Sequence, residues 1–210
     1  MDDYGYGYWY LVALNVIIFG LFILFIPFRK RQQRLPASVY LAFIVALYTE
    51  MYGFPLTIYV LTWLLGYQNP LTHTSGHILA PIIGEDLFFM VVHPISNIMI
   101  LTGILLVVLG WREVHSAQQE LVTTGLYAYV RHPQYLGFIT LTLGMIVQWA
   151  TLPTLLMWPL LVILYYQLAK QEEKEMEAKF GEKYRKYKSK VPMMLPLRKL
   201  NWSFRRLVNS

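Results

Sequence analysis

The densest group of side chains able to do chemistry lies within residues 121–137, which read LVTTGLYAYVRHPQYLG. Arg131 offers a planar donor fork that suits a carboxylate, and His132 next to it precedes Pro133. A residue before proline favours an extended conformation and proline suits the first turn of a helix, so we expect His132 at a helix N-terminus. Free N–H groups and the helix dipole attract anions there. The segment therefore suits a ligand's carboxylate or ribose hydroxyl; a basic and aromatic interface anchor is the structural alternative.

A second group is the acidic pair Glu172–Glu173. The turn at 150–153 is short, so the apolar runs on its two sides are expected to form antiparallel helices. Residues 167–180 contain no Gly or Pro, so the second helix should continue beyond the apolar run and return the two carboxylates to the depth of His132. A buried carboxylate needs a partner, and a cationic cofactor would supply one. The alternative is a solvated helix with the charge run KQEEKEMEAK.

The elements that must position these groups belong to a very apolar chain. Of its 210 residues, 56% are hydrophobic and 14% are charged, and the mean hydropathy is +0.42. Soluble domains carry about 25% charged residues, so the composition predicts a membrane protein. The chain has no cysteine, which excludes disulfides, thiolate metal sites and a cysteine nucleophile.

Five apolar runs predict an all-α integral membrane protein with about five transmembrane helices. The runs are residues 10–28, 39–66, 87–111, 135–149 and 152–169. The second run exceeds one straight span and contains Pro55, which removes a backbone donor, so we expect a kink or break there.

The distribution of basic residues predicts the orientation. Residues 29–34, 112–131 and 170–210 contain four, two and twelve Lys and Arg, which together are all 18 in the chain. With five spans, all three segments lie on one side, which the positive-inside rule makes the cytoplasm. The prediction is a multi-pass, N-out and C-in protein whose active site faces the cytoplasm. The net charge of +6 therefore does not indicate a nucleic-acid partner.

Several isolated polar residues are further candidates. Glu50 lies within an apolar run, and an ionisable group there is a functional hypothesis; a hydrogen-bonded structural glutamate near the break is the alternative. His93 and Asn97 lie in the third run and are candidates for contact with a substrate. The pair His73 and His77 has a spacing that binds metal on a helix, but its segment reads as a loop, so we predict no metal site.

The order of motifs resembles the isoprenylcysteine carboxyl methyltransferase family, whose wider group includes phospholipid methyltransferases. The shared features are RHPxYxG, an apolar hairpin, a glutamate pair, FGxxYxxY and a Val-Pro…Pro ending, over about residues 110–196. The resemblance divides the chain into N-terminal transmembrane helices at 1–110 and a methyltransferase-like region at 111–210, with a C-terminal helical hairpin and a cytoplasmic cofactor-binding extension.

The resemblance implies S-adenosylmethionine as cofactor. Carried over by position, it implies contacts from Glu120, Leu121, Val122, Tyr127, His132, Pro133, Gln134, Tyr135 and Glu172. The methyl donor supplies the reaction, and the protein must align donor and acceptor and exclude water. Arg131, Glu173 and Glu50 are the candidate catalytic residues, and Glu173, His93 and His115 are candidate bases.

One position departs from the family pattern and concerns the acceptor. The family's arginine for the substrate carboxylate stands four residues before the cofactor-binding glutamate, and here that position is Leu168. A prenylated-protein carboxylate is therefore disfavoured, while a membrane lipid headgroup, a small thiol or an amine stay open as lipophilic or small-molecule acceptors. An NADPH-dependent membrane reductase with a related hairpin, and a non-catalytic membrane protein that retains the motif, are the alternative functions.

Overall fold

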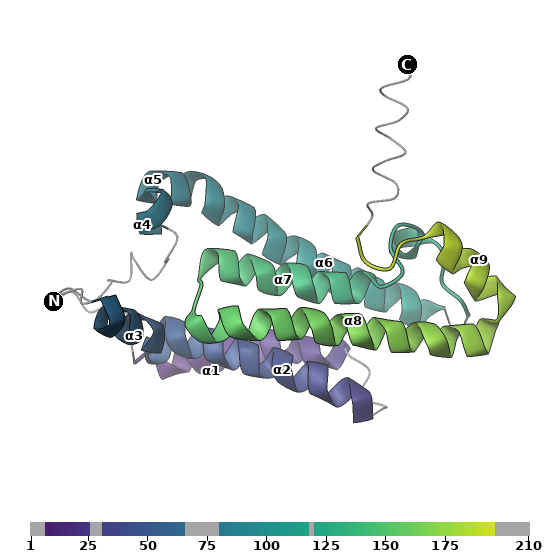
Figure 1. The fold of residues 1–210 in the computed structure, drawn as a ribbon, viewed down its shortest axis with the longest axis horizontal. Helices are drawn as coiled ribbons and strands as arrows, with labels where there is room; N and C mark the ends of the chain where they lie inside the picture. The colour runs from purple at the N-terminus through teal and green to yellow at the C-terminus, as the bar shows by residue number, and fades with distance from the viewer. Residues whose placement is uncertain (1–6, 26–30, 66–79, 118–119, 196–210) are drawn as a thin grey trace, which may run out of the picture.

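Every regular element of the described chain is helical, which confirms the predicted all-α class for those residues. The computed structural model describes residues 7–25, 31–65, 80–117 and 120–195. In chain order the elements are α1 (Trp9–Gly20), the 3-10 turn η1 (Leu21–Phe25), α2 (Arg31–Tyr48), the π-helical turn η2 (Thr49–Gly53), α3 (Leu56–Leu65), α4 (Ala80–Ile83), α5 (Glu85–Leu87), the π-helical turn η4 (Phe88–Val92), α6 (His93–Ser116), the 3-10 turn η5 (Gly125–Ala128), α7 (Pro133–Gln148), α8 (Leu152–Phe180) and α9 (Glu182–Lys190). The long helices run side by side, and α9 folds back at one end of α8 (Figure 1).

Among the residues that the structure describes, three helical stretches are long and apolar enough to cross a membrane. They are Arg34–Gly53, Glu85–Ser116 and Leu152–Phe180. The first predicted span forms a shorter apolar stretch, Trp9–Phe25, and the fourth forms α7, which has 16 residues. At 1.5 Å per residue α7 is about 24 Å long, against about 30 Å for a hydrocarbon core. The count of five spans and the orientation therefore stay predictions.

The predicted break at Pro55 is confirmed. The π-helical turn η2 ends at Gly53, Phe54 is extended with φ −125° and ψ 113°, and α3 begins at Leu56. The buried carboxylate of Glu50 accepts hydrogen bonds from the backbone N–H and the hydroxyl of Thr57, at 2.9 and 3.1 Å. It thereby satisfies a donor in the first turn of α3, where no backbone partner exists.

Helices α6 and α7 pack closely because glycines lie between them. A Cβ added at Gly103 would lie 2.7 Å from the carbonyl oxygen of Gly137, and one at Gly144 would lie 2.9 Å from the carbonyl oxygen of Ser96. Small residues allow two helix backbones to approach in this way. The contact continues to Gly110, where a Cβ would lie 3.2 Å from Cγ of Pro133. The start of α7 is therefore held against the C-terminal half of α6.

The hairpin of α7 and α8 forms as predicted, and α8 continues unbroken to Phe180. Thr151 caps α8: its hydroxyl accepts from the N–H of Thr154 at 3.3 Å, and its own N–H donates to the hydroxyl of Thr154 at 3.2 Å. A glycine with φ +55°, Gly181, ends α8 and allows the sharp turn into α9. The chain then runs back along α8, a return that the sequence did not predict.

Candidate functional site

The turn before the RHP motif is held by an acidic residue of α6. Both carboxylate oxygens of Glu113 accept from the N–H of Leu126, at 3.2 and 3.1 Å. Gly125, with φ +58°, lies directly against this carboxylate, and a Cβ there would be 2.3 Å from Oε1 of Glu113. Glu113 was not a predicted site residue, because nothing in the sequence pairs it with a loop thirteen residues later.

His132 occupies the N-cap position of α7 and Pro133 the first turn, as predicted. The ring stacks on Tyr135 with centroids 5.7 Å apart. Its Nδ1 lies 3.6 Å from Oε2 of Glu172 and its Nε2 lies 3.5 Å from Oε1 of Glu173. Burial lowers the pKa of His132, but the two carboxylates outweigh burial and raise it above its ordinary value. The imidazole is therefore favoured in its charged form.

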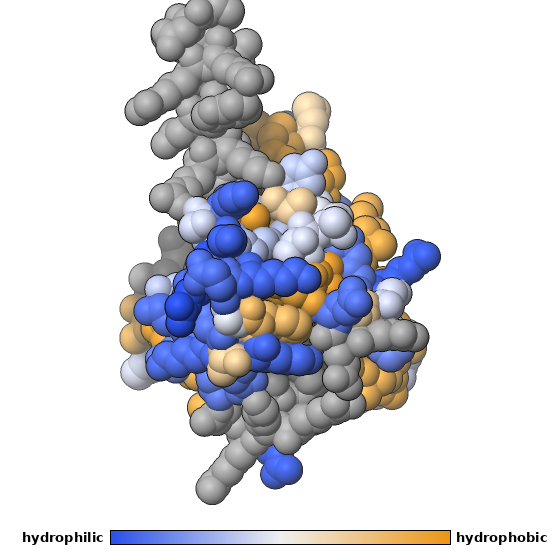
Figure 2. Space-filling model, turned by 90° about the vertical axis from the view of Figure 1, so that its right-hand side faces the viewer, coloured by the Kyte–Doolittle hydropathy of each residue, from blue (hydrophilic) through white to orange (hydrophobic). Residues whose placement is uncertain are grey.

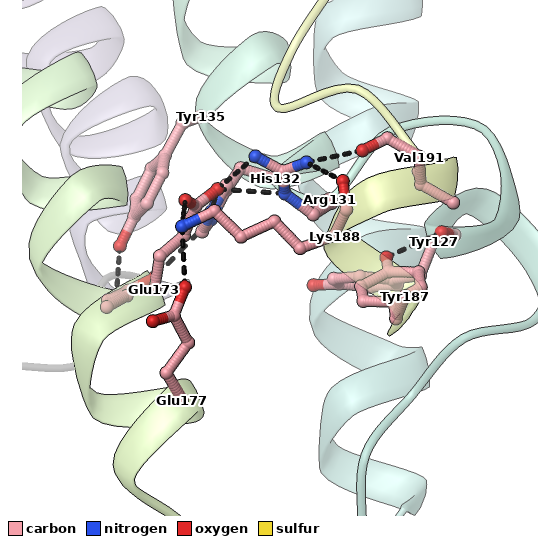
Figure 3. A network of polar contacts seen from close by, with 10 residues as sticks. Tyr127, Arg131, His132, Tyr135, Glu173, Glu177, Tyr187, Lys188 and Val191 are labelled. Atoms are coloured by element: carbon pink, nitrogen blue, oxygen red, sulfur yellow. Dashed lines mark hydrogen bonds and ion pairs between the residues drawn. The ribbon is translucent and has the colours of Figure 1, made fainter. Parts of the chain in front are cut away.

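The two adjacent glutamates have different environments. The side chain of Glu173 is 4% exposed, and that of Glu172 is 24% exposed. Glu173 accepts from Nε of Arg131 at 2.8 Å and lies 3.0 Å from Nζ of Lys188 (Figure 3), whereas Glu172 accepts from the hydroxyl of Tyr135. In the part of α8 beyond the apolar run, burial raises the pKa of Glu173, but His132, Lys188 and Arg131 lower it to about 2. Glu173 is thus a permanently charged partner of three cations.

Arg131 joins three parts of the chain. Besides Glu173, its guanidinium donates to the carbonyl oxygens of Lys188, at 2.9 Å, and Val191. The backbone N–H groups of Arg131 and His132 donate to the carbonyl oxygens of Pro192 and Met193, at 2.9 and 3.0 Å. Residues 191–195, called the strap below, therefore lie along the start of α7. The guanidinium fork that we predicted for a ligand's carboxylate is therefore engaged by Glu173 and the strap.

A cavity of about 250 Å³ lies between the start of α7, the end of α8 and α9. It is lined by Val114, Glu120, Leu121, Val122, Tyr127, Arg131, His132, Gln134, Glu172, Glu175, Met176, Tyr184 and Tyr187. The end of the molecule that carries α9 presents mainly hydrophilic side chains around a smaller apolar area (Figure 2).

Most of the predicted cofactor residues gather at this cavity. Seven of the nine line it, while Pro133 packs against α6 and Tyr135 supports Glu172 from beside it. The tyrosines of α9, Tyr184 and Tyr187, were not predicted as site residues, although the FGxxYxxY pattern contains them. The hydroxyl of Tyr187 donates to the carbonyl oxygen of Tyr127 at 2.6 Å, so α9 is the wall that closes the cavity.

Other predicted site residues lie elsewhere. Nε2 of His93 lies 2.9 Å from Nε2 of Gln148, the last residue of α7, and its Nδ1 lies 3.2 Å from Nδ2 of Asn97. At 1.5 Å per residue, that end of α7 is about 22 Å from Pro133. Glu50 is tied to Thr57 instead. These candidates are therefore not brought to the cavity.

The remaining candidates are placed as follows. Leu168 lies one turn before Glu172, is 4% exposed and belongs to the apolar core. The ring of His115 stacks on Trp111 with centroids 4.7 Å apart. His73 and His77 lie outside the described residues. Within the described residues, no three His, Cys, Asp or Glu side chains are grouped in a way that could hold a metal ion.

The cavity suits a ligand that combines a positive charge with an aromatic ring. Three carboxylates line it, from Glu120, Glu172 and Glu175, together with the three tyrosines named above. Carboxylates and aromatic faces both attract cations, and aromatic faces also stack on a flat base. Nε2 of His132 is buried, and its one charged neighbour in the described chain, Oε1 of Glu173, lies at 3.5 Å, beyond ordinary hydrogen-bond distance. These features fit S-adenosylmethionine.

The same wall does not suit a nicotinamide cofactor with a 2′-phosphate. Of the described residues that line the cavity, Arg131 is the one Lys or Arg, and Glu173 and the strap carbonyls engage it. A phosphate there would face carboxylates without a free cation, which costs Coulomb energy.

Comparison with known proteins agrees with the predicted resemblance. Residues 87–178 match the Isoprenylcysteine carboxyl methyltransferase (ICMT) family. The Protein-S-isoprenylcysteine O-methyltransferase of Schizosaccharomyces pombe is 38% identical over 78 residues, which are 37% of this chain and 33% of that protein. The Methanethiol S-methyltransferase of Crocosphaera subtropica is 34% identical over 97 residues, 46% of this chain and 37% of that protein.

A longer alignment, with the Methanethiol S-methyltransferase 2 of Bradyrhizobium diazoefficiens, is 32% identical over 137 residues, which are 61% of this chain and 50% of that protein. The chain thus spans a third to a half of the length of these relatives. The predicted resemblance to an ICMT-like family is confirmed, and the matched region contains α6, α7 and most of α8, with Arg131, His132 and both glutamates.

Proposed function

We propose that the protein is an integral membrane methyltransferase that uses S-adenosylmethionine, bound in the cavity between α7, α8 and α9. The observation that carries the proposal is the approach of His132 and Glu172 at one cavity. They come from the two motifs that the family resemblance assigns to this cofactor. The cofactor, when bound, supplies a methyl group activated by a positively charged sulfur.

The residues of the chain bind and orient the cofactor and move a proton; none of them forms a bond to the methyl group. Glu172 and Glu175 place negative charge beside the sulfonium and the amino group, and the tyrosines pack against the adenine. The hydroxyl of Tyr135 fixes the orientation of Glu172, while Arg131 and Glu173 hold α7, α8 and the strap together behind it. Such a supporting network keeps a binding group at a defined place.

A thiol is the acceptor that the site supports best. Leu168 is buried where the family's carboxylate-binding arginine would stand, and the guanidinium of Arg131 is engaged by Glu173 and by the carbonyl oxygens of Lys188 and Val191. A carboxylate acceptor would therefore lack a cation, whereas a neutral thiol needs none. Two of the relatives described above are named methanethiol S-methyltransferases, which agrees with this choice.

A bound S-adenosylmethionine, held by Glu172, His132 and the tyrosines, would supply the methyl group to the acceptor sulfur and keep the electron pair of the broken bond, while the acceptor would lose its thiol proton. The thiol proton passes to Glu172 and from there to solvent, because Glu172 lines the cavity and is partly exposed. Glu173 is a poor base, since its pKa of about 2 keeps it charged. We place the cavity on the cytoplasmic side, where the positive-inside rule puts every Lys and Arg.

The test is binding of S-adenosylmethionine to the purified protein in detergent, followed by transfer of a labelled methyl group. We expect Glu172→Ala and His132→Ala to lose binding, and Lys174→Ala, an exposed neighbour on α8, to retain it. Labelled product should form with methanethiol or a longer alkyl thiol and not with a prenylcysteine whose carboxylate is the acceptor. Normal binding in both site variants, or tighter binding of NADPH than of S-adenosylmethionine, would contradict the proposal.

A further inference from the structure

A second hollow lies on the outer face of the α7–α8 hairpin, under the strap. It encloses about 740 Å³ and is mostly apolar. It is lined by Leu136, Ile139, Val162, Ile163, Tyr166, Gln167, Lys170, Met193, Met194 and Leu195. None of these residues lines the 250 Å³ cavity. The hollow, called the outer groove below, is therefore a separate feature of the described chain.

The walls of the outer groove face away from the helix bundle. Ile163 is 52% exposed and Tyr166 is 44% exposed, and both lie on a helix long and apolar enough to cross a membrane. The strap that leaves α9 passes beside α7 (Figure 1), and its residues Met193, Met194 and Leu195 line the groove. An exposed apolar groove on such a helix is expected to be filled by hydrocarbon.

One end of the outer groove carries a positive charge. Nζ of Lys170 lies 4.5 Å from the ring centroid of Tyr166, and Gln167 is on the same end. Lys170 is the first residue after the apolar run 152–169, so it stands where a helix leaves hydrocarbon for the headgroup region. Tyrosine and lysine are typical of that depth. The groove therefore has an apolar channel that leads to a cation at headgroup level.

We propose that the outer groove binds one anionic phospholipid, with an acyl chain along α7 and α8 and the phosphate at Lys170. The charge of Lys170 and the apolar walls match the two halves of such a lipid. We assign the lipid as a structural ligand and not as the methyl acceptor, because the backbone of the strap lies between the outer groove and the RHP motif. On the side away from the groove, the carbonyl oxygens of the strap accept from the N–H groups of Arg131 and His132.

The site has a consequence for the strap. Met193 and Met194 form one wall of the outer groove, and the carbonyl oxygen of Met193 accepts from the N–H of His132 at 3.0 Å. A lipid packed on these methionines would hold the strap in place and thereby protect the backbone hydrogen bonds that it makes with Arg131 and His132. Lipid binding is thus coupled, through residues 191–193, to how firmly the backbone of Arg131 and His132 is held in place.

The test uses the full chain without S-adenosylmethionine, so that it does not depend on the proposed function. Native mass spectrometry would compare retention of phosphatidylglycerol and phosphatidylcholine from mixed nanodiscs. We expect preferential retention of one phosphatidylglycerol, weakened about fivefold in Lys170→Gln, the change expected for one cation at a membrane surface. Lys174→Gln, one turn further along α8 and outside the groove, should retain the lipid as the unchanged protein does.

A second variant and a second measurement complete the test. Val162→Trp fills the outer groove and should abolish retention while leaving the chain folded, as judged by circular dichroism. Hydrogen exchange at the amides of Arg131 and His132 should be slower with phosphatidylglycerol than with phosphatidylcholine. Equal retention of both lipids, or dimers in place of lipid adducts, would overturn the assignment.

Discussion

The two ends of the α7–α8 hairpin both bury polar groups, but they do so in different ways. At the end near Pro133, charges are paired: Arg131, His132 and Lys188 surround Glu173 beside a cavity. At the end near Gln148 and Leu152, Glu50 accepts from Thr57, whose hydroxyl accepts from the N–H of Leu152 at 2.9 Å.

The comparison shows that a lone acidic residue in an apolar run does not identify a functional site. Glu50 satisfies the donors left by the break at Pro55 and ties the start of α3 to the start of α8. Glu172, by contrast, leaves part of its carboxylate facing a cavity. The useful distinction is whether the oxygens of a buried carboxylate all accept hydrogen bonds from the protein itself, or whether one of them is still able to accept a hydrogen bond from a ligand.

The largest effect is expected from breaking the charged network. Arg131→Met would leave Glu173 buried without its principal partner and should reduce stability by about 3–5 kcal/mol. The apparent melting temperature in detergent should fall steeply, with Arg112→Met, an exposed arginine, as the control. The double variant Arg131→Met/Glu173→Leu should recover much of the loss, and no recovery would show that the bonds to the strap dominate.

The next effect concerns the turn held by α6. Gly125→Ala places a Cβ on the Glu113 carboxylate and forces an unfavourable φ, so we expect a loss of about 1–3 kcal/mol and weaker cofactor binding. Gly181→Ala is a matched control, because that glycine has a similar φ of +55° with nothing within 4 Å of an added Cβ. Gly181→Ala should lower the stability less than Gly125→Ala does. An equal loss of stability in both variants would contradict the role that we assign to Glu113.

A smaller effect separates the two ends directly. Glu50→Gln retains an acceptor for the N–H of Thr57 and should cost about 1 kcal/mol, without a change in affinity for S-adenosylmethionine. Glu172→Gln should alter the melting temperature little but weaken cofactor binding at least about tenfold, as loss of a charge-assisted contact does. Titration calorimetry and thermal unfolding on both variants would check this, and the opposite pattern would reverse the two assignments.

The mildest effect is that of pH on the charged end. The lowered pKa of Glu173 stabilises the fold above its ordinary value of 4.5, and this contribution is lost as pH falls toward about 2. The raised pKa of His132 stabilises the fold below its ordinary value of 6.5, and this contribution is lost as pH rises through the raised value. Melting temperature should therefore decline above about pH 6.5, and His132→Gln should flatten that decline.

The sequence predicted much of this arrangement. The missing Gly and Pro in residues 167–180 and the short turn at 150–153 were enough to predict one continuous helix that returns Glu172 to His132, because helix geometry converts residue number into length. Pro55 was enough to predict the break. The His–Pro pair placed His132 at the start of α7.

The roles of individual polar residues were less accessible. Arg131 was predicted to offer its donors to a ligand's carboxylate, yet they bond to Glu173 and the strap, since α9 reverses at Gly181 and brings residues 188–193 back to α7. His93 and Asn97 were predicted near the acceptor, yet they lie with Gln148 at the far end of α7. Such pairings depend on the register between helices, which apolar runs do not specify.

What the sequence by itself determined is the class of the protein: apolar helices, a hairpin, and two motifs brought to one depth by fixed helix lengths. The resemblance already assigned Glu172 to the cofactor, but only the tertiary structure decided that Glu173, a predicted catalytic residue, closes the network with Arg131 behind the cavity. The physical reason is that neighbours in a helix point about 100° apart, so a rotation set by the packing of α8 against α7 and α2 assigns Glu172 to the cavity and Glu173 to Arg131.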